Sequence, residues 1–257
     1  MDFQIKNKLF VVCGATSGFG EATAKVLLNE GAKVICIARG IEKLENLKNK
    51  FPQAEILAGD LTSLETIDRV MDCLGERFID GVFINGGGPP AGNSLETTID
   101  MWDEAYQKII RWKIYFAQLI VKKMLPQNYG RIVFLESCSV KQVIDNLVLS
   151  NSLRMAVVGF AKTLSSEVAE RGITVNVLAP GLHDTAAMQR LYKNKSENEH
   201  ISIEEAKQKF TESIPVKRLG ESDEIAVLAL WMLSPVSGFV TGQTISHDGG
   251  FVRGVFG

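Results

Sequence analysis

The chain has 257 residues, of which 46% are hydrophobic and 23% charged, and its formal net charge is −2 at pH 7. This composition excludes a disordered chain and a disulfide-stapled miniprotein, and the charge provides no basic field to hold nucleic acid. The apolar runs are far shorter than the roughly 20 residues that cross a bilayer, so no membrane partner is expected. The first six residues show no charged-then-apolar leader pattern, which favours a cytoplasmic protein.

Apolar runs alternate with longer amphipathic stretches along the chain. In order, the pattern predicts strand 9–13, helix 18–30, strand 34–38, helix 41–51, strand 54–58, helix 64–78, strand 81–85, helix 99–124, strand 131–135, helix 153–170, strand 173–178, helix 223–233 and a last strand from 243 to 246. Runs that are apolar throughout suit parallel strands covered on both faces. We therefore predict an α/β fold over 1–257, a single-domain Rossmann-type doubly wound parallel sheet of about seven strands flanked by helices.

One stretch, 182–215, departs from this alternation. It is polar and partly helical, around 203–210, and it follows the strand 173–178. Ligands bind at the carboxyl edge of doubly wound sheets. We predict that 182–215 is a substrate lid over that edge.

A glycine-rich turn follows the first predicted strand. It consists of Gly14, Ala15, Thr16, Ser17, Gly18, Phe19 and Gly20. Glycines allow a sharp turn and a close backbone approach to a pyrophosphate, and the following helix N-terminus favours negative charge. Because the turn lies between a strand and a helix in the first βα unit, we predict that it binds a dinucleotide phosphate. The alternative is a tight turn that only packs the helix on the strand.

The end of the second predicted strand indicates which dinucleotide is preferred. An NAD site usually has an acid there for the ribose 2′-hydroxyl, whereas this chain has Ala38 followed by Arg39. A guanidinium suits a 2′-phosphate, so we predict NADP(H) rather than NAD(H) as the cofactor. The alternative is that Arg39 only borders a surface loop.

With these features the chain resembles the short-chain dehydrogenase/reductase family over nearly its whole length. The glycine turn matches the family's, with Cys13 where threonine is usual. Further matches are Asp60-Leu61, Asn85-Gly86, the stretch 174–181 that ends in Pro180-Gly181, Thr185, Thr241-Gly242 and Asp248-Gly249-Gly250. The resemblance implies that Asp60 contacts the adenine ring and Thr185 the nicotinamide carboxamide. It also implies a homotetramer or homodimer, paired through a C-terminal region that contains Trp231, Met232, Leu233 and Phe239.

The family's catalytic tetrad is mostly absent from this chain. Ser137 matches the serine that binds the substrate oxygen, but Ser150 and Arg154 stand where the resemblance implies the tyrosine and lysine of YxxxK. Ile109 stands at the asparagine position. A serine hydroxyl has a far higher pKa than a phenol, and arginine does not usefully release its proton. The stretches 88–90, 146–151 and 201–206 resemble a divergent subgroup, similar to 3-oxoacyl-carrier-protein reductases, whose members can lack the full tetrad.

Several residues are candidates to replace the missing tyrosine as proton donor. His183 lies near the expected nicotinamide and histidines titrate near neutrality, although a solvent-facing loop histidine is the alternative interpretation. Glu136 ends a strand where burial could raise its pKa, unless it is a salt-bridged carboxylate. Tyr192 could swing in from the lid. Cys138 could be a nucleophile but has no clear base nearby. The cysteines and histidines show no metal-ligand spacing, so no metal site is expected.

Two functions from different classes are compatible with these residues. The first is an NADP(H)-dependent oxidoreductase acting on a small carbonyl or alcohol, in which Ser137, Ser150, Arg154 and His183 serve catalysis and the proton comes from an unusual residue or ordered water. The second is a non-redox descendant that binds a nucleotide or metabolite as a sensor or scaffold, or that performs another carbonyl reaction. An inactive partner subunit in a mixed oligomer is a third possibility.

Overall fold

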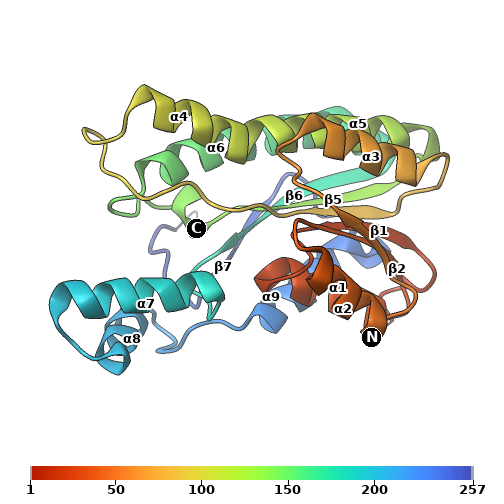
Figure 1. Ribbon diagram of the computed structural model, residues 1–257. Helices are drawn as coiled ribbons and strands as arrows, with labels where there is room; N and C mark the ends of the chain where they lie inside the picture. The colour runs from red at the N-terminus through yellow and green to blue at the C-terminus, as the bar shows by residue number, and fades with distance from the viewer. Residues whose placement is uncertain (1, 256–257) are drawn as a thin grey trace.

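Seven parallel strands form one sheet at the centre of the protein (Figure 1), in the order β3-β2-β1-β4-β5-β6-β7. The computed structural model describes residues 2–255, apart from the side chains of residues 186, 187, 190, 194 and 198. The strands are β1 (Leu9–Cys13), β2 (Lys33–Ala38), β3 (Glu55–Ala58), β4 (Gly81–Ile84), β5 (Gly130–Leu135), β6 (Ile173–Pro180) and β7 (Thr244–His247). The predicted doubly wound α/β fold is confirmed, and the strand order reverses between β1 and β4.

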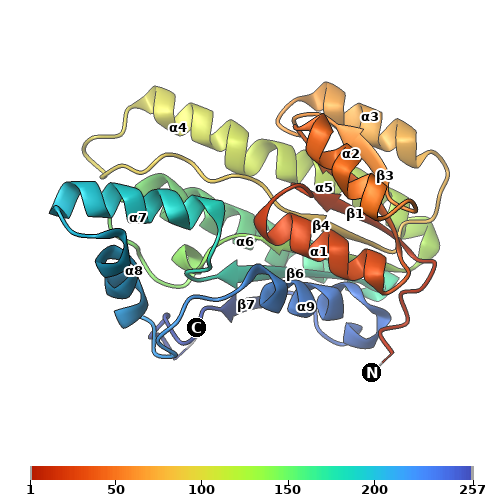
Figure 2. The same cartoon turned by 60° about the horizontal axis from the view of Figure 1, so that its bottom comes forward.

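Helices cover both faces of the sheet (Figures 1 and 2). One face carries α1 (Gly18–Asn29), α2 (Ile41–Lys50) and α9 (Ser222–Leu233). The other carries α3 (Leu64–Leu74), α4 (Ile99–Tyr106), α5 (Trp112–Met124) and α6 (Val148–Val168). Successive residues of a strand alternate between faces, so Val11 packs in the core beneath α5 and α6 while Val12 packs in the core beneath α1 and α9. Burial on both faces explains why the strands are apolar throughout.

The predicted lid stretch contains two helices, α7 (Ala186–Glu199) and α8 (Ile203–Glu212). They lie to one side of the sheet in Figures 1 and 2, beyond the carboxyl end of β6. The sequence pattern predicts the helix around 203–210 but not α7, because the sequence of α7 is strongly polar and shows little apolar periodicity. Among residues 2–255, every helix is too short or too polar to be a membrane span.

Three of the predicted helices differ from the structure by more than two residues at one end or in their continuity. The helix predicted for 64–78 ends at Leu74, because Gly75 takes a positive φ of 50° and stops the turn. The helix predicted for 99–124 is interrupted by a π-helical segment, Gln107–Arg111. The helix predicted from 153 begins at Val148, because the Asn151 side chain bonds both the amide and the carbonyl of Ile144 and orders the preceding loop.

Candidate active site

The glycine turn connects β1 to α1 at the point where the strand order reverses. Gly14 has a φ of 68°, and a Cβ there would lie 2.7 Å from Nδ2 of Asn85. At Gly20 a Cβ would overlap the Gly14 carbonyl. A side chain at Gly14 would collide with Asn85, and one at Gly20 would push the helix off the turn, which is why the local sequence needs glycine.

The N-terminus of α1 is open to an anion. Ser17 is the N-cap residue, and its hydroxyl makes no capping hydrogen bond. The first backbone N–H groups of a helix have no partner within the helix, so here they are available to a phosphate. Thr16 and Phe19 flank Ser17 in the same turn. The arrangement fits the pyrophosphate of a dinucleotide.

Arg39 and Asp60 follow β2 and β3 at the same sheet edge. Arg39 is exposed, and among the described residues its guanidinium makes no hydrogen bond or ion pair. Partial burial opposes ionisation of Asp60, but hydrogen bonds from the Thr62 amide and hydroxyl and the charge of Arg39 outweigh it and lower the pKa of that carboxyl. Leu61 beside it is buried. This edge therefore offers an available cation and a stable anion to polar ligand groups.

The turn after β6 brings the predicted lid stretch beside the glycine turn. Pro180 ends β6, and the Gly181 amide donates to the His247 carbonyl at 3.0 Å. Thr185 is the N-cap of α7, and its hydroxyl accepts a hydrogen bond from the Met188 amide. A Cβ on Gly18 would lie 3.8 Å from Cγ2 of Thr185, so residues far apart in sequence adjoin here. Asn85, which follows β4, lies next to Gly14, and Gly86 is the next residue in the chain.

A buried ionic network occupies the place of the missing tyrosine and lysine. Glu136 follows β5 directly, and its side chain is fully buried. One carboxylate oxygen accepts from Nζ of Lys113, and the other accepts from Nη1 of Arg154 at 2.9 Å. The Lys113 side chain is also fully buried, and that of Arg154 is 9% exposed. Two cations thus share one anion inside the protein.

Lys113 is not among the candidates that the sequence patterns indicate. It lies in the buried stripe of α5 with Ala117 and Val121, directly after the π-helical segment, which changes the helix register by its wider turn. Burial is the main cause that lowers the pKa of Lys113; Arg154 adds to the effect and Glu136 opposes it. Lys113 could have been identified as a candidate because it is a lysine at an apolar helix position, where its charge needs a buried partner.

Three serines extend the network toward β5. Ser150 Oγ accepts from Nε of Arg154 at 3.1 Å, one helical turn away on α6, and lies 3.3 Å from Oγ of Ser139. Ser137 Oγ accepts from the Ser139 amide at 3.2 Å, and the Ser137 hydroxyl also interacts with the neighbouring Cys138 thiol. The structure therefore brings three sequence candidates, Ser137, Ser150 and Arg154, into one cluster.

The cysteine beside this cluster is not activated. Burial is the main cause that raises the pKa of the Cys138 thiol to about 11. A thiol with that pKa is protonated at neutral pH and is a poor nucleophile.

His183 is 4% exposed and has both ring nitrogens engaged. Its Nδ1 lies 3.1 Å from the Gly181 carbonyl, and its Nε2 lies 2.9 Å from Nδ1 of His247. A carbonyl only accepts, so Nδ1 of His183 carries the proton and Nε2 accepts from His247. The edge of the Phe19 ring packs on His183, with ring centroids 5.0 Å apart. His183 therefore joins the glycine turn to the base of the lid.

Tyr192 lies in the lid core. It is 1% exposed among Met188, Ile214 and Leu219, and its hydroxyl has no hydrogen-bond partner among the described residues. Burial is the main cause that raises its pKa to about 12. The ring packs against Phe210 of α8, which ties the two lid helices together.

The environment of His183 predicts a pH-dependent stability. Burial lowers the pKa of His183 in the fold, so the unfolded chain binds this proton more readily. The stabilisation is present above the unfolded value of about 6.5 and is lost as pH falls toward the folded pKa. We expect His183→Gln to flatten the fall in melting temperature between pH 7.5 and 5, measured by calorimetry. His200→Asn, at an exposed position, is the control and should retain the wild-type slope; an unchanged slope in His183→Gln would contradict the assignment.

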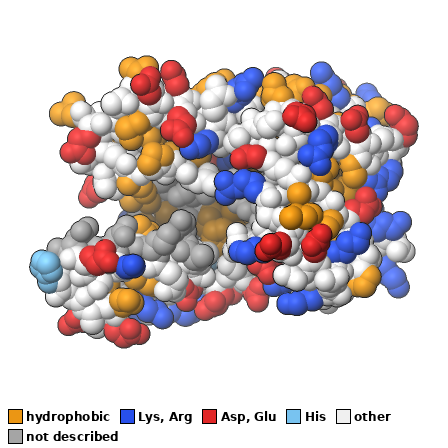
Figure 3. All heavy atoms as spheres, viewed as in Figure 1, with side chains coloured by type: hydrophobic (Ala, Val, Ile, Leu, Met, Phe, Trp, Pro, Cys, Tyr) orange, Lys and Arg blue, Asp and Glu red, His pale blue; other side chains and the backbone are white. Residues whose placement is uncertain are grey.

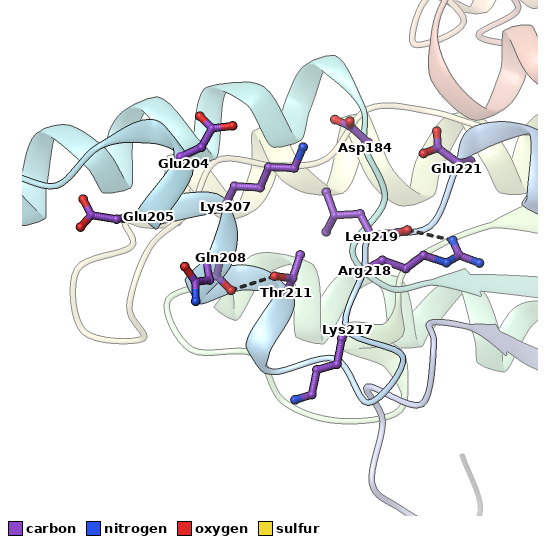
Figure 4. A pocket seen from close by; sticks show the side chains of 10 residues that line it. All are labelled: Asp184, Glu204, Glu205, Lys207, Gln208, Thr211, Lys217, Arg218, Leu219 and Glu221. Atoms are coloured by element: carbon purple, nitrogen blue, oxygen red, sulfur yellow. Dashed lines mark hydrogen bonds between the residues drawn. The ribbon is translucent and has the colours of Figure 1, made fainter.

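A polar pocket of about 540 Å³ lies on the lid (Figure 4). Charged side chains line it, among them Lys207 of α8, Arg218 and Glu221 from the segment before α9, and Asp184 from the turn before α7. Arg218 is already bonded to Glu224 and to the Leu219 carbonyl. None of the residues that line this pocket belongs to the Ser137 cluster or to the glycine turn. A separate hollow opens between the lid side and the α4 side of the molecule (Figure 3).

Comparison with known proteins places this geometry in a family. The profile of a family described as enoyl-(acyl carrier protein) reductase matches residues 14–252. The chain is 28% identical over 258 residues to the 3-oxoacyl-[acyl-carrier-protein] reductase of Aquifex aeolicus, covering 97% of this chain and 99% of that protein.

Two solved structures are similar over almost the whole chain. One is actinorhodin polyketide ketoreductase with NADPH, with a TM-score of 0.90 and 28% identity, covering 96% of this chain and 98% of that one. The other is L-sorbose reductase from Gluconobacter frateurii with NADPH and L-sorbose, with a TM-score of 0.93 and 25% identity, covering 99% and 100%. The family profile spans most of the sequence, and the predicted resemblance is confirmed: this chain belongs to the short-chain dehydrogenase/reductase family, with 3-oxoacyl-carrier-protein reductases among its relatives.

Proposed function

We propose that the protein is an NADP(H)-dependent reductase of small carbonyl compounds. The observation that carries this proposal is the available guanidinium of Arg39 on the same sheet edge as the open N-terminus of α1. The helix N-terminus would hold the pyrophosphate, and Arg39 would hold the 2′-phosphate. The relatives solved with NADPH support the same cofactor. The non-redox alternative is not favoured.

The position of Arg39 and Asp60 supports one direction for the bound cofactor. They follow β2 and β3, so the adenosine end lies on that side of the glycine turn. The opposite end then extends over the carboxyl ends of β4, β5 and β6, where Asn85, Ser137 and Thr185 follow the strands. We propose that Thr185 and the turn at Gly181 hold this end, beneath a lid formed by 182–215.

The serine cluster would bind the substrate oxygen. Bound NADPH supplies a hydride. The Ser137 hydroxyl can donate its proton to a carbonyl oxygen and stabilise the charge that develops there. Ser150 is held by Arg154 and Ser139 and offers a second hydroxyl. Arg154 does not release its proton usefully, and His183 has both nitrogens engaged, so we propose that ordered water delivers the proton.

The proposed function is tested by NADPH oxidation in the presence of ketones, aldehydes and β-keto esters. We expect turnover of at least one class with NADPH and at least 10-fold lower kcat/KM with NADH. Substrate-dependent oxidation should be lost in heat-denatured protein. Binding of NADPH without turnover of any carbonyl class would support the non-redox alternative instead.

Arg39→Ala tests the assignment of the 2′-phosphate. Loss of a charge-assisted contact should weaken NADPH binding about 10- to 100-fold and change NADH binding less than about twofold. Titration calorimetry measures both affinities. Arg171→Ala is the control, because Arg171 is exposed beyond α6, at the start of β6 rather than its carboxyl end. Equal losses for NADPH and NADH in Arg39→Ala would show that Arg39 does not recognise the 2′-phosphate.

We also propose a homotetramer, in keeping with the family resemblance. Met232 and Leu233 are buried in the core of their own chain, so they do not support an interface. Phe239 is fully exposed nearby, and Val227 and Val236 are partly exposed. Sedimentation velocity tests the assembly, and Phe239→Asp should shift it toward smaller species. A cytoplasmic location stays a prediction that cell fractionation tests.

A further inference from the structure

The Arg154 guanidinium keeps one nitrogen unused. Nε donates to Ser150 and Nη1 donates to Glu136, whereas Nη2 makes no hydrogen bond among the described residues. The whole residue is 7% exposed, and Nη2 is not one of its fully buried atoms, so a ligand can reach this donor from the solvent side. A guanidinium N–H that is held in place by its neighbours and accessible to a ligand is a strong donor to a carboxylate.

The unused nitrogen faces the loop after β4. A Cβ on Gly88 would lie 3.2 Å from Nη2 of Arg154, whereas a Cβ on Gly87 would meet no atom within 4 Å. Gly88 is exposed, and neither glycine takes a positive φ. The nitrogen therefore lies between the carboxyl ends of β4 and β5, next to the Ser137 cluster.

The charges around this nitrogen favour an anion. Among the described residues, Lys113 and Arg154 share Glu136 as their one contacting carboxylate, and both oxygens of Glu136 are occupied. A second acid on this side is Asp248. Its charge raises the pKa of the Cys138 thiol, whereas the charge of Arg154 lowers it. The Asp248 oxygens accept from the Gly250 and Val252 amides, so its charge is bound within its own turn. The network thus has one more cation than anion where the substrate would lie.

We infer that the carbonyl substrate carries a carboxylate that Arg154 Nη2 binds, so that the substrates are oxo acids rather than neutral ketones. This inference rests on the proposed function for the position of the carbonyl. Glu136 fixes the guanidinium, and Ser137 holds the carbonyl oxygen. A carboxylate at Nη2 completes the hydrogen bonds of Arg154 and offsets the excess cation.

The test compares acids with their neutral esters. Pyruvate, acetoacetate and 4-oxopentanoate are each paired with the methyl ester, because the three place the carboxylate at increasing distances from the carbonyl. We expect at least one acid to exceed its ester about 10- to 100-fold in kcat/KM with NADPH. Esters that match or exceed the acids in all three pairs would overturn the inference and leave the reductase function intact.

Two glycine variants separate the role of Nη2 from the stability of the network. In Gly88→Ala the methyl group covers Nη2 without changing any charge. We expect this variant to lose about 10-fold or more in kcat/KM for the preferred acid, mainly through KM, and less than about twofold for its ester. Gly87→Ala is the matched control and should behave as wild type. Equal losses for acid and ester in Gly88→Ala would contradict the inference.

A binding measurement keeps the two proposals distinguishable. The preferred acid, or all three acids when none is turned over, is titrated calorimetrically into the protein with NADP⁺ present. Binding of an acid that weakens in Gly88→Ala, without turnover of any carbonyl, would retain the carboxylate site and remove the reductase function. Turnover of esters without measurable binding of any acid would retain the reductase function and remove the carboxylate site.

Discussion

Glu136→Gln should lower the free energy of unfolding by about 3 to 5 kcal/mol. The variant removes the one anion between Lys113 and Arg154, and the Lys113 side chain has no exposure to water that could solvate its charge. Two buried cations would then face each other across a neutral amide. Urea unfolding at fixed protein concentration measures the change.

Lys113→Met in the same background should restore much of this loss. The double variant leaves Arg154 as the one charge of the original three, beside a neutral side-chain amide at position 136 that can still accept a hydrogen bond. We expect a coupling energy of about 1 to 3 kcal/mol between the two substitutions. Glu104→Gln breaks an exposed pair with Lys108 and should change stability by less than about 1 kcal/mol. Additive losses in the double variant would contradict the network.

Ser137→Ala should reduce kcat about 10²- to 10³-fold with a small change in NADPH affinity. The Ser139 amide holds the Ser137 hydroxyl in place, so the substitution removes a positioned donor to the developing oxyanion. Steady-state kinetics on the best substrate of the carbonyl series measures kcat and KM separately.

The control for this variant is Ser166→Ala, an exposed serine on α6. It should retain wild-type kinetics. Because Ser137 also caps a short helical turn, its loss should cost about 1 kcal/mol of stability, and a thermal melt separates this effect from catalysis. A folded Ser137→Ala protein with wild-type kcat would remove Ser137 from the chemistry.

The local features of the cofactor end could be predicted from the sequence. The glycine turn, Arg39 and Asp60 each depend on one strand and the residues that directly follow it. Parallel strands end at one edge, so these short segments meet whatever the details of packing. The contact between Ser150 and Arg154 could also be predicted, because residues four apart on a helix are neighbours.

The ionic network could not be predicted in the same way. Lys113 reaches Glu136 across two different elements, and its direction depends on the π-helical segment Gln107–Arg111, which no sequence pattern indicates. His183 pairs with His247 across 64 positions through the register of β6 and β7. The interpretation of His183 as a free loop residue or proton donor considers its own segment alone, whereas tertiary contacts set its hydrogen bonds.

The role of Tyr192 in the predicted lid also depends on tertiary contacts that the sequence does not show. The sequence leaves open that Tyr192 swings toward the substrate, because a tyrosine in a polar segment looks available. In the fold its ring supports the contact between α7 and α8, with Phe210 at a centroid distance of 5.6 Å. A lone aromatic residue in a polar helix is more often a packing residue than a reactive one.

The sheet edge that carries the glycine turn, Arg39 and Asp60 should bind NADP(H). Calorimetric titration of the purified protein with NADPH, NADP⁺ and NADH tests it most directly. We expect micromolar NADPH binding and at least 10-fold weaker NADH binding. No binding of any dinucleotide would contradict the claim, and it would mean that the glycine turn and Arg39 serve a purpose other than cofactor recognition.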